Sequence, residues 1–186
     1  MVYCCTLQAF QADKEKKLHV TLERKNKGLS IKYQLQSDIN QLLIPKNQGS
    51  TERKDQLWQH TCFELFLRDN RQPERYWEFN FSPSGEWNAY QFQGYRQKMQ
   101  TAKGYQHLMI DCQLTPEEFI LSTDIPFPIE WLKSDTPLIA LNLTAVLEDK
   151  QNKISYWALQ QATPQADFHA PHCFIALTDL ITSTSA

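Results

Sequence analysis

Two neighbouring segments of the sequence carry acidic and amide side chains inside apolar runs. Residues 57–67 read LWQHTCFELFL, and residues 76–90 read YWEFNFSPSGEWNAY. Side chains alternate between the two faces of an extended strand, so each segment has one apolar and one polar face. If the apolar faces of the two strands lie on the same side of the sheet, the opposite side carries a polar row made of Glu64, Glu78, Asn80 and Ser82.

A polar row of this kind, flanked by aromatic residues, is suited to a ligand with several hydroxyl groups. Aromatic faces stack on sugar rings, while carboxylate and amide groups bind their hydroxyls. The flanking aromatic residues are Trp58, Trp87 and Tyr90, and Asn80 is expected to bond a ligand hydroxyl. The alternative is a solvated face, because antiparallel sheets normally carry a polar face toward water.

Glu64 lies between Phe63 and Leu65, where a carboxylate is costly to bury unless it is paired. Arg96 is a candidate partner. A second alternative is a glycosidase pair made by Glu64 and Glu78, since retaining enzymes hold two carboxyl groups about 5 Å apart. Strand pairing often brings carboxylates together without catalysis, so the alternation alone does not establish this pair.

A second cluster lies near the end of the sequence, in residues 156–160 and 167–174. Asp167, His169 and His172 could hold a metal ion, with His60 as a distant further ligand. Pro171 favours an extended loop, however, in which side chains three residues apart diverge. A loop held by hydrogen bonds of Asp167 and His169 is the alternative that this pattern favours.

Alternation of period two along most of the chain predicts the strands that must position these residues. Residues 18–22 and 29–35 form a hairpin around Asn26-Lys27-Gly28, and residues 46–55 form a mobile surface loop because they contain no apolar side chain. The prolines at 126 and 128 leave at most a short helical turn at residues 128–132. The other predicted strands are residues 61–68, 76–82, 86–92, 107–114, 119–124, 138–147, 153–159 and 172–177.

About ten short strands separated by turns predict an all-β antiparallel β-sandwich of the jelly-roll type. The 186 residues suit a single domain over residues 1–186, with a frayed tail at 181–186. The formal net charge of −2 argues against duplex nucleic acid and anionic membrane as partners. The start of the sequence lacks the features of a signal peptide, and no stretch is apolar enough to cross a bilayer, so we expect a cytoplasmic protein.

The five cysteines are predicted to be reduced and mostly buried, because their number is odd and their spacing matches no zinc signature. The sequence contains no GxSxG, HExxH or CxxC motif and no glycine-rich phosphate loop. These absences argue against standard nucleotide chemistry. A small molecule remains the expected partner.

The stretches that carry these residues resemble the bacterial DOMON-like domains, which are relatives of DOMON domains and of family 9 carbohydrate-binding modules. The matching stretches are residues 57–64, 76–87, 94–96, 156–159 and 167–169. The resemblance implies a jelly-roll-like β-sandwich that binds a sugar or haem in a pocket at one face, and it does not imply an enzyme. Haem would need a Met and a His as axial ligands, for which the candidates are Met99, Met109, His169 and His172.

Residues and resemblance together predict a non-catalytic module that binds a carbohydrate or a sugar-like metabolite without a cofactor. The alternatives are a haem-binding redox domain and a glycan-acting hydrolase that uses Glu64 and Glu78. The predicted ligand-binding residues are Trp58, His60, Glu64, Glu78, Asn80, Ser82, Trp87, Tyr90, Arg96, Trp157 and His169.

Overall fold

The computed structural model describes residues 1–47, 49, 51–133 and 138–180 of the chain. Its regular elements in this part are strands and single 3-10 turns. The strands are β1 (Val2–Ala9), β2 (Lys17–Lys25), β3 (Gly28–Gln36), β4 (Cys62–Asp69), β5 (Tyr76–Phe81), β6 (Trp87–Phe92), β7 (Gln100–Thr101), β8 (Ile110–Leu114), β9 (Glu118–Pro126), β10 (Ile139–Glu148), β11 (Ile154–Ala158) and β12 (Ile175–Ala176). The 3-10 turns are η1 (Ile39–Gln41), η2 (Leu57–Gln59), η3 (Trp131–Lys133), η4 (Pro171–Cys173) and η5 (Leu177–Asp179).

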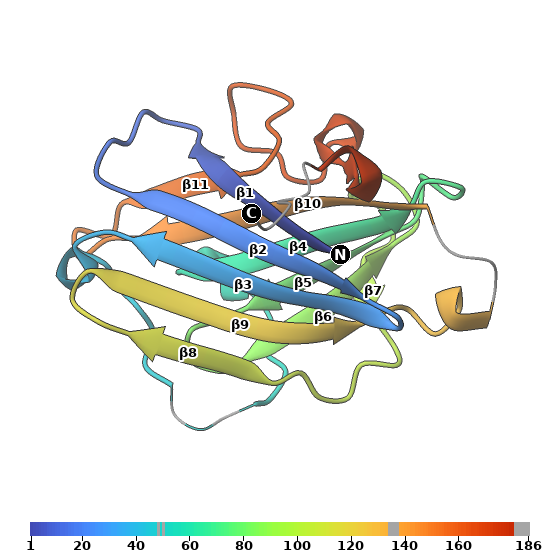
Figure 1. Cartoon of the computed structure of the whole chain (residues 1–186), viewed down its shortest axis with the longest axis horizontal. Coiled ribbons are helices and arrows are strands. Elements are labelled where there is room, and N and C mark those ends of the chain that lie inside the picture. Colours follow the sequence, from blue (N-terminus) through green and yellow to red (C-terminus); the bar gives the residue numbers. More distant parts are fainter. Residues whose placement is uncertain (48, 50, 134–137, 181–186) are drawn as a thin grey trace.

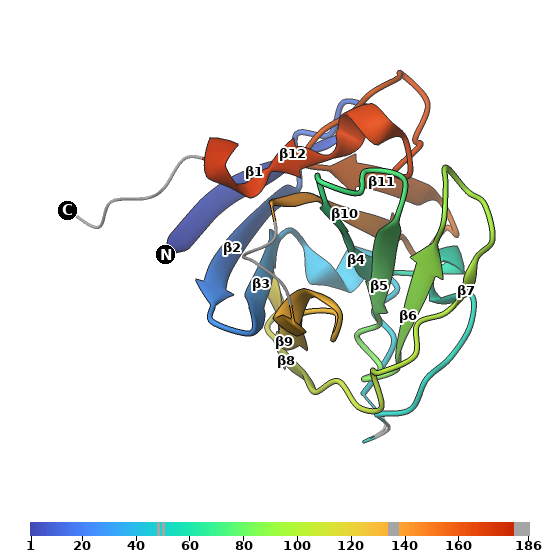
Figure 2. The same cartoon turned by 90° about the vertical axis from the view of Figure 1, so that its right-hand side faces the viewer.

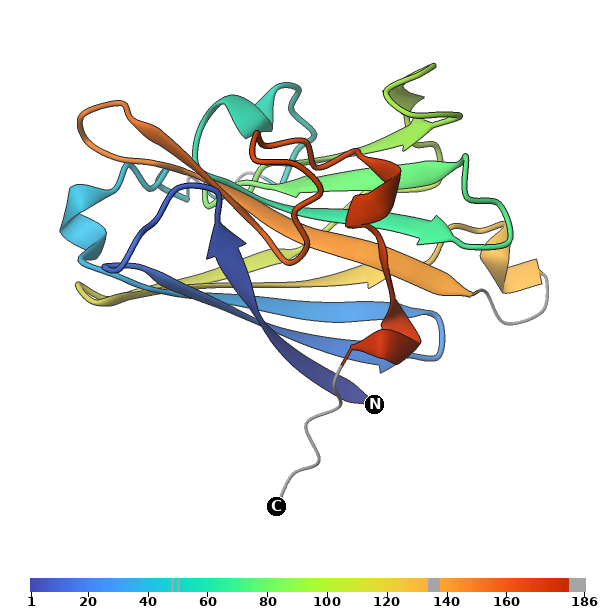
Figure 3. The same cartoon turned by 90° about the horizontal axis from the view of Figure 1, so that it is seen from above.

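The strands form one continuous antiparallel sheet that curls into two packed layers (Figures 1 and 3). The first layer has the order β1-β2-β3-β9-β8, and the second has the order β7-β6-β5-β4-β10-β11. Strand β1 joins them, because residues 2–7 pair with β2 while Gln8 and Ala9 pair with β11. The chain that follows β11 returns alongside β10, where β12 pairs with it (Figure 2).

The main core lies between the two layers, and period-two alternation explains which side chains fill it. In the hairpin of β2 and β3, alternate residues such as Leu18, Val20 and Tyr33 are almost fully buried there. In the second layer the inward residues include Phe63 on β4 and Phe79 on β5. The predicted all-β antiparallel sandwich is therefore confirmed. Among the described residues, no helix is long and apolar enough to span a membrane.

Several local predictions differ from the structure. Strand β1 was not predicted, although Tyr3 and Leu7 alternate in it as buried residues. The strand predicted at residues 172–177 is wrong over most of its length, because η4 and η5 flank a strand of only two residues. The short turn predicted at residues 128–132 is found slightly later, as η3. The predicted frayed tail at 181–186 lies outside the described residues.

The predicted surface loop at residues 46–55 is anchored in its second half. The backbone N–H of Lys54 donates to the Trp87 carbonyl, and the backbone N–H of Trp87 donates to the Glu52 carbonyl. The Trp87 indole also donates to the Thr51 carbonyl, at 2.8 Å. The Arg53 guanidinium lies 4.3 Å from the centre of the Trp87 ring. An arginine and backbone groups thus fix a segment that has no apolar side chain to pack.

The candidate ligand pocket

The outer face of the second layer carries the polar row that strand parity predicts. Register places Thr144 of β10, Glu64 of β4, Asn80 of β5 and Asn88 of β6 side by side across four strands. The adjacent row contains Phe66 opposite Glu78 and Glu78 opposite Tyr90. All members of the first row are buried, the most exposed of them at 3%. This face is therefore covered, and the solvated-face alternative is excluded for it.

The cover comes from the loops that contain Phe10, Trp58, Arg96 and Phe168, and it lies over a second apolar cluster on the sheet. Phe66, Tyr76, Tyr90 and Phe92 form the buried part of this second apolar cluster, and Trp58, Phe168 and Phe174 pack against it. Between the sheet and its cover lies a pocket of about 780 Å³. Its lining comprises Phe10, Gln11, Trp58, Glu64, Phe66, Glu78, Phe92, Arg96, Met99, Val146, Ile154, Ser155, Tyr156, Pro164, Gln165, Ala166, Phe168 and His169.

Glu64 and Glu78 place two carboxyl groups at the floor of the pocket. The Thr144 hydroxyl donates to Oε2 of Glu64 at 2.7 Å, and the Asn80 amide donates to Oε1 of Glu78 at 2.8 Å. Burial raises the pKa of both carboxyl groups into the neutral range, and the charge of Glu78 raises the pKa of Glu64 further. The pair therefore keeps a proton at neutral pH and offers both a donor and acceptors.

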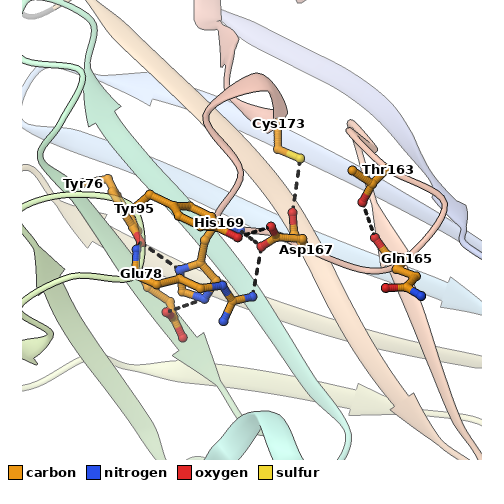
Figure 4. A network of polar contacts seen from close by, with 9 residues as sticks. Tyr76, Glu78, Tyr95, Thr163, Gln165, Asp167, His169 and Cys173 are labelled. Atoms are coloured by element: carbon orange, nitrogen blue, oxygen red, sulfur yellow. Dashed lines mark hydrogen bonds and ion pairs between the residues drawn. The ribbon is translucent and has the colours of Figure 1, made fainter.

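A hydrogen-bonded chain holds His169 above Glu78 (Figure 4). The Arg96 backbone N–H donates to the Tyr76 hydroxyl at 3.1 Å, and this hydroxyl lies 2.9 Å from Nδ1 of His169. The opposite ring nitrogen, Nε2, lies 3.7 Å from Oε2 of Glu78. Burial, with the nearby Arg96 charge, lowers the pKa of His169 to about 4, so the imidazole is neutral at pH 7. We assign the proton to Nε2, because Tyr76 can then donate to Nδ1 while it accepts from Arg96.

Asp167 fastens the covering loop over the pocket (Figure 4). Its carboxylate accepts hydrogen bonds from the Tyr95 hydroxyl at 2.6 Å and from the Arg96 guanidinium at 2.9 Å. Burial acts to raise the pKa of Asp167, but these two hydrogen bonds, the charge of Arg96 and the His169 backbone N–H together outweigh it and lower the pKa. The expected pairing of Arg96 with Glu64 is thus replaced by an ion pair with Asp167 at the rim.

The structure brings five of the predicted ligand-binding residues to the pocket lining, and they are Trp58, Glu64, Glu78, Arg96 and His169. Two others face the polar side but lie beneath or behind the lining. Asn80 is fully buried and contacts Glu78, and the Tyr90 hydroxyl donates to Asp55 at 2.7 Å while Trp58 packs against its ring. These two residues therefore support lining residues.

Four predicted residues lie away from the pocket, and register explains two of them. Trp87 is opposite Phe81 and Trp157 is opposite Ala145, so both indoles face the core between the layers. Ser82 bonds to Ser84 in the turn after β5. The imidazole of His60 is largely exposed and lies 2.8 Å from the Glu148 carboxylate. For Trp87 and Trp157, the prediction took aromatic type as evidence and overlooked strand parity.

The lining also includes residues that the sequence did not suggest. Phe66 and Phe92 share strand faces with Glu64 and Tyr90, so parity could have found them. Phe10 and the residues 164–166 reach the pocket through tertiary packing of loops, for which the sequence carries no comparable signal.

The side chains considered for a metal ion or haem do not converge on such a group. In the described part of the chain, no three His, Cys, Asp or Glu side chains are arranged to hold a metal. Met99 and His169 both line the pocket, whereas the Met109 sulfur contacts His107 at 3.0 Å. Both ring nitrogens of His169 face Tyr76 and Glu78, so this imidazole does not fit the role of a haem ligand.

Comparison with known proteins finds similar structures but no similar sequence. No family profile matches the chain, and no curated protein matches it by sequence. A candidate carbohydrate-binding protein from Bacteroides uniformis has a similar structure, with a TM-score of 0.69 and 14% identity over 93% of this chain and 84% of that one.

Two structures of a family 9 carbohydrate-binding module from Caldicellulosiruptor kristjanssonii are also similar. The complex with cellotriose has a TM-score of 0.58 and 10% identity, over 99% of this chain and 89% of that one. The complex with glucose has a TM-score of 0.54 and 11% identity, over 91% and 81% of the two chains. The chain therefore has the β-sandwich fold of carbohydrate-binding modules.

Proposed function

We propose that this protein is a non-catalytic binding module that holds a sugar-like ligand in the pocket on the outer face of its second layer. The observation that carries the proposal is the pocket itself, which has aromatic walls and a floor with two hydrogen-bonding carboxyl groups. A volume of about 780 Å³ falls within the usual range of ligand pockets. The fold shared with carbohydrate-binding modules supports the same ligand class.

The chemistry of the lining suits a ring with apolar faces and polar edges. Trp58, Phe66 and Phe92 offer apolar surface to a ring face. The partly protonated carboxyl pair can donate to one hydroxyl and accept from another, and the Arg96 side chain lies at the rim. Neutral His169 adds no charge that would have to be desolvated on binding.

The arrangement of the carboxyl groups favours binding over hydrolysis. Glycosidases place their two carboxyl groups on either side of the scissile bond. Glu64 and Glu78 come from adjacent strands and both lie on the same floor. A ligand above this floor meets both groups from one side.

Isothermal titration calorimetry with glucose and cellotriose tests the proposal. We expect saturable binding of at least one of them, and a loss of about two- to twelvefold in affinity for Trp58→Ala. Glu148→Gln is the control for removal of a buried carboxylate, because Glu148 is 8% exposed but does not line the pocket. Absence of binding to every hydroxylated ring compound tested, neutral or cationic, or release of reducing ends from cellotriose by the protein, would contradict the proposal.

A further inference from the structure

The two carboxyl groups on the floor of the pocket have no ion-pair partner among the described residues that is charged at neutral pH. Among the described residues, Glu64 has no cationic side chain within 4.0 Å, and the Thr144 hydroxyl donates a hydrogen bond to its carboxylate. The basic side chain nearest to Glu78 is the imidazole of His169, at 3.7 Å, and this imidazole is neutral at pH 7. Arg96, the one arginine in the lining, forms its ion pair with Asp167, although its charge also acts to lower the pKa of Glu78.

Two carboxyl groups that are 2% and 5% exposed, and that still line a cavity, are costly to ionise without a cationic partner. We propose that the pocket selects a cationic ligand, a hydroxylated ring with a protonated amine whose ammonium group lies between the carboxylates of Glu64 and Glu78. The inference rests on the proposed function, which places a hydroxylated ring in the pocket, and it adds that the ligand carries a positive charge.

The walls above the two carboxylates suit an ammonium group as well as a ring. An ammonium ion is attracted to the faces of aromatic rings, and the attraction is stronger where water is excluded. Phe66 stands beside Glu64 on β4, and Trp58 and Phe92 complete the nearby aromatic lining. An ammonium group also brings three donors, so it can satisfy both carboxylates at once.

Binding of such a cation should expel the proton that the carboxyl pair holds. Before binding, the pair holds a proton at neutral pH; after binding, both carboxyl groups are ionised and the proton passes to the buffer. The other titratable groups that interact with the pair are Tyr33, Cys62, Tyr76, Tyr90, Arg96 and His169. Burial raises the pKa of Cys62 and of the three tyrosines, so these groups stay neutral, and Arg96 stays paired with Asp167.

The test compares two matched probes, trans-4-aminocyclohexanol and trans-cyclohexane-1,4-diol, by calorimetry with the whole protein. An alkylammonium group stays protonated from about pH 6 to pH 8, as the lysine side chain does. We expect the amine to bind at least about tenfold more tightly than the diol at pH 8. Its affinity should rise with pH, by up to about tenfold per unit for one released proton, and the measured heat should depend on the ionisation enthalpy of the buffer.

Substitution of the carboxyl groups provides a second, independent measurement. Glu64→Gln and Glu78→Gln should each lower the affinity for the amine by about tenfold or more and change the affinity for glucose by less. Glu148→Gln should change neither affinity. The pH and buffer dependence of the unmodified protein keeps the inference testable if a substituted protein fails to fold.

The outcomes separate this inference from the proposed function. Equal binding of amine and diol would overturn the preference for a cation, whereas binding of glucose in the same protein would leave the proposed function standing. Selective binding of the amine without binding of neutral sugars would support the inference and count against a neutral sugar as the ligand. If neither probe binds, the inference is wrong.

Discussion

At the scale of residues, burial changes the chemistry of the two floor glutamates. Strand parity places Glu64 and Glu78 on the same face, but the aromatic residues above them remove most of the water. Burial keeps a proton on the pair at neutral pH, and repulsion between the two carboxylates raises the pKa of Glu64 further. This raised pKa connects the site to the stability of the whole protein.

Glu64→Gln should stabilise the protein more at alkaline pH than at acidic pH. A carboxyl group with a raised pKa holds its proton in the folded state after the unfolded chain has released it, so the stability of the natural protein falls as pH rises from about 4.5 into the neutral range. Glutamine resembles the protonated form and removes this dependence. We expect a relative gain of about 1–3 kcal/mol between pH 5 and pH 8.5, measured by urea unfolding.

The exposed residue Glu117 offers a control for the loss of one negative charge. Glu117→Gln should not reproduce the gain at alkaline pH. His169 produces the opposite trend, since its lowered pKa makes stability rise between about pH 4 and pH 6.5. Comparison of Glu64→Gln with the natural protein at each pH removes the His169 contribution. A constant difference across the pH range would contradict the raised pKa of Glu64.

Asn80→Ala should reduce stability rather than remove a direct ligand contact. Asn80 is fully buried, donates to Glu78 and accepts from the Cys62 thiol at 3.7 Å. Removing its amide leaves the Glu78 carboxyl group without this donor, at an expected cost of about 1–3 kcal/mol in the free energy of unfolding. Equilibrium unfolding measures it. Full stability together with a selective loss of glucose affinity would indicate that Asn80 reaches the ligand after all.

At the scale of elements, the segment before η2 shows how an arginine can replace an apolar anchor. The Arg53 guanidinium donates to carbonyl oxygens of Ala89, Ala102 and Tyr105 and to the Asn88 side chain, and it stacks on Trp87. It thereby ties residues 51–55 to β6 and to the chain after β7. The segment needs no apolar side chain, because the side chain that packs against the rest of the protein is that of Arg53.

Arg53→Ala should therefore destabilise the protein by about 2–4 kcal/mol in urea unfolding, because it removes the guanidinium donor from the carbonyl groups of Ala102 and Tyr105 and the ring contact with Trp87. The neighbouring residue provides a matched control. Lys54 forms an ion pair with Glu86 at 3.0 Å, and more than half of its side chain is exposed. Lys54→Ala should cost less than about 1 kcal/mol. Similar costs for the two substitutions would contradict the anchoring role of Arg53.

At the scale of the whole molecule, the sandwich closes without covalent links. Strand β1 pairs with β2 at one end and with β11 at the other, so it joins the two layers through backbone hydrogen bonds. All five cysteines lie in the described residues as thiols, and Cys62 and Cys173 are buried. Cys4 is exposed, whereas Cys5 and Cys112 are half-buried, so the expectation that most cysteines are buried holds for only two of the five.

Thiol titration with an aromatic disulfide should count five reactive groups after unfolding in the absence of reductant, and Cys4 should react first in the native protein. Burial raises the pKa of Cys5 and Cys112 to about 12, which leaves little thiolate at neutral pH. Cys62 should react only on unfolding. A count of three thiols in unfolded protein would reveal a disulfide and contradict this arrangement.

The sequence by itself determined the all-β class and the faces of the strands that surround the pocket. Alternation of period two is a local property, since it follows from the geometry of an extended chain and from the burial of one face. For this reason Glu64, Glu78 and Asn80 could be placed on one surface before any pairing was known. The same rule, applied to β6 and β11, places Trp87 and Trp157 toward the core.

Only the tertiary structure decided what covers that surface. Parity cannot tell whether a polar face meets water or another part of the chain, because the cover comes from residues far away in sequence, such as Phe10 and Phe168. Those loops turn a polar row into a pocket floor, pair Arg96 with Asp167 rather than with Glu64, and hold His169 neutral above Glu78. Burial and long-range contacts, which no local pattern encodes, thus set the charge of the site.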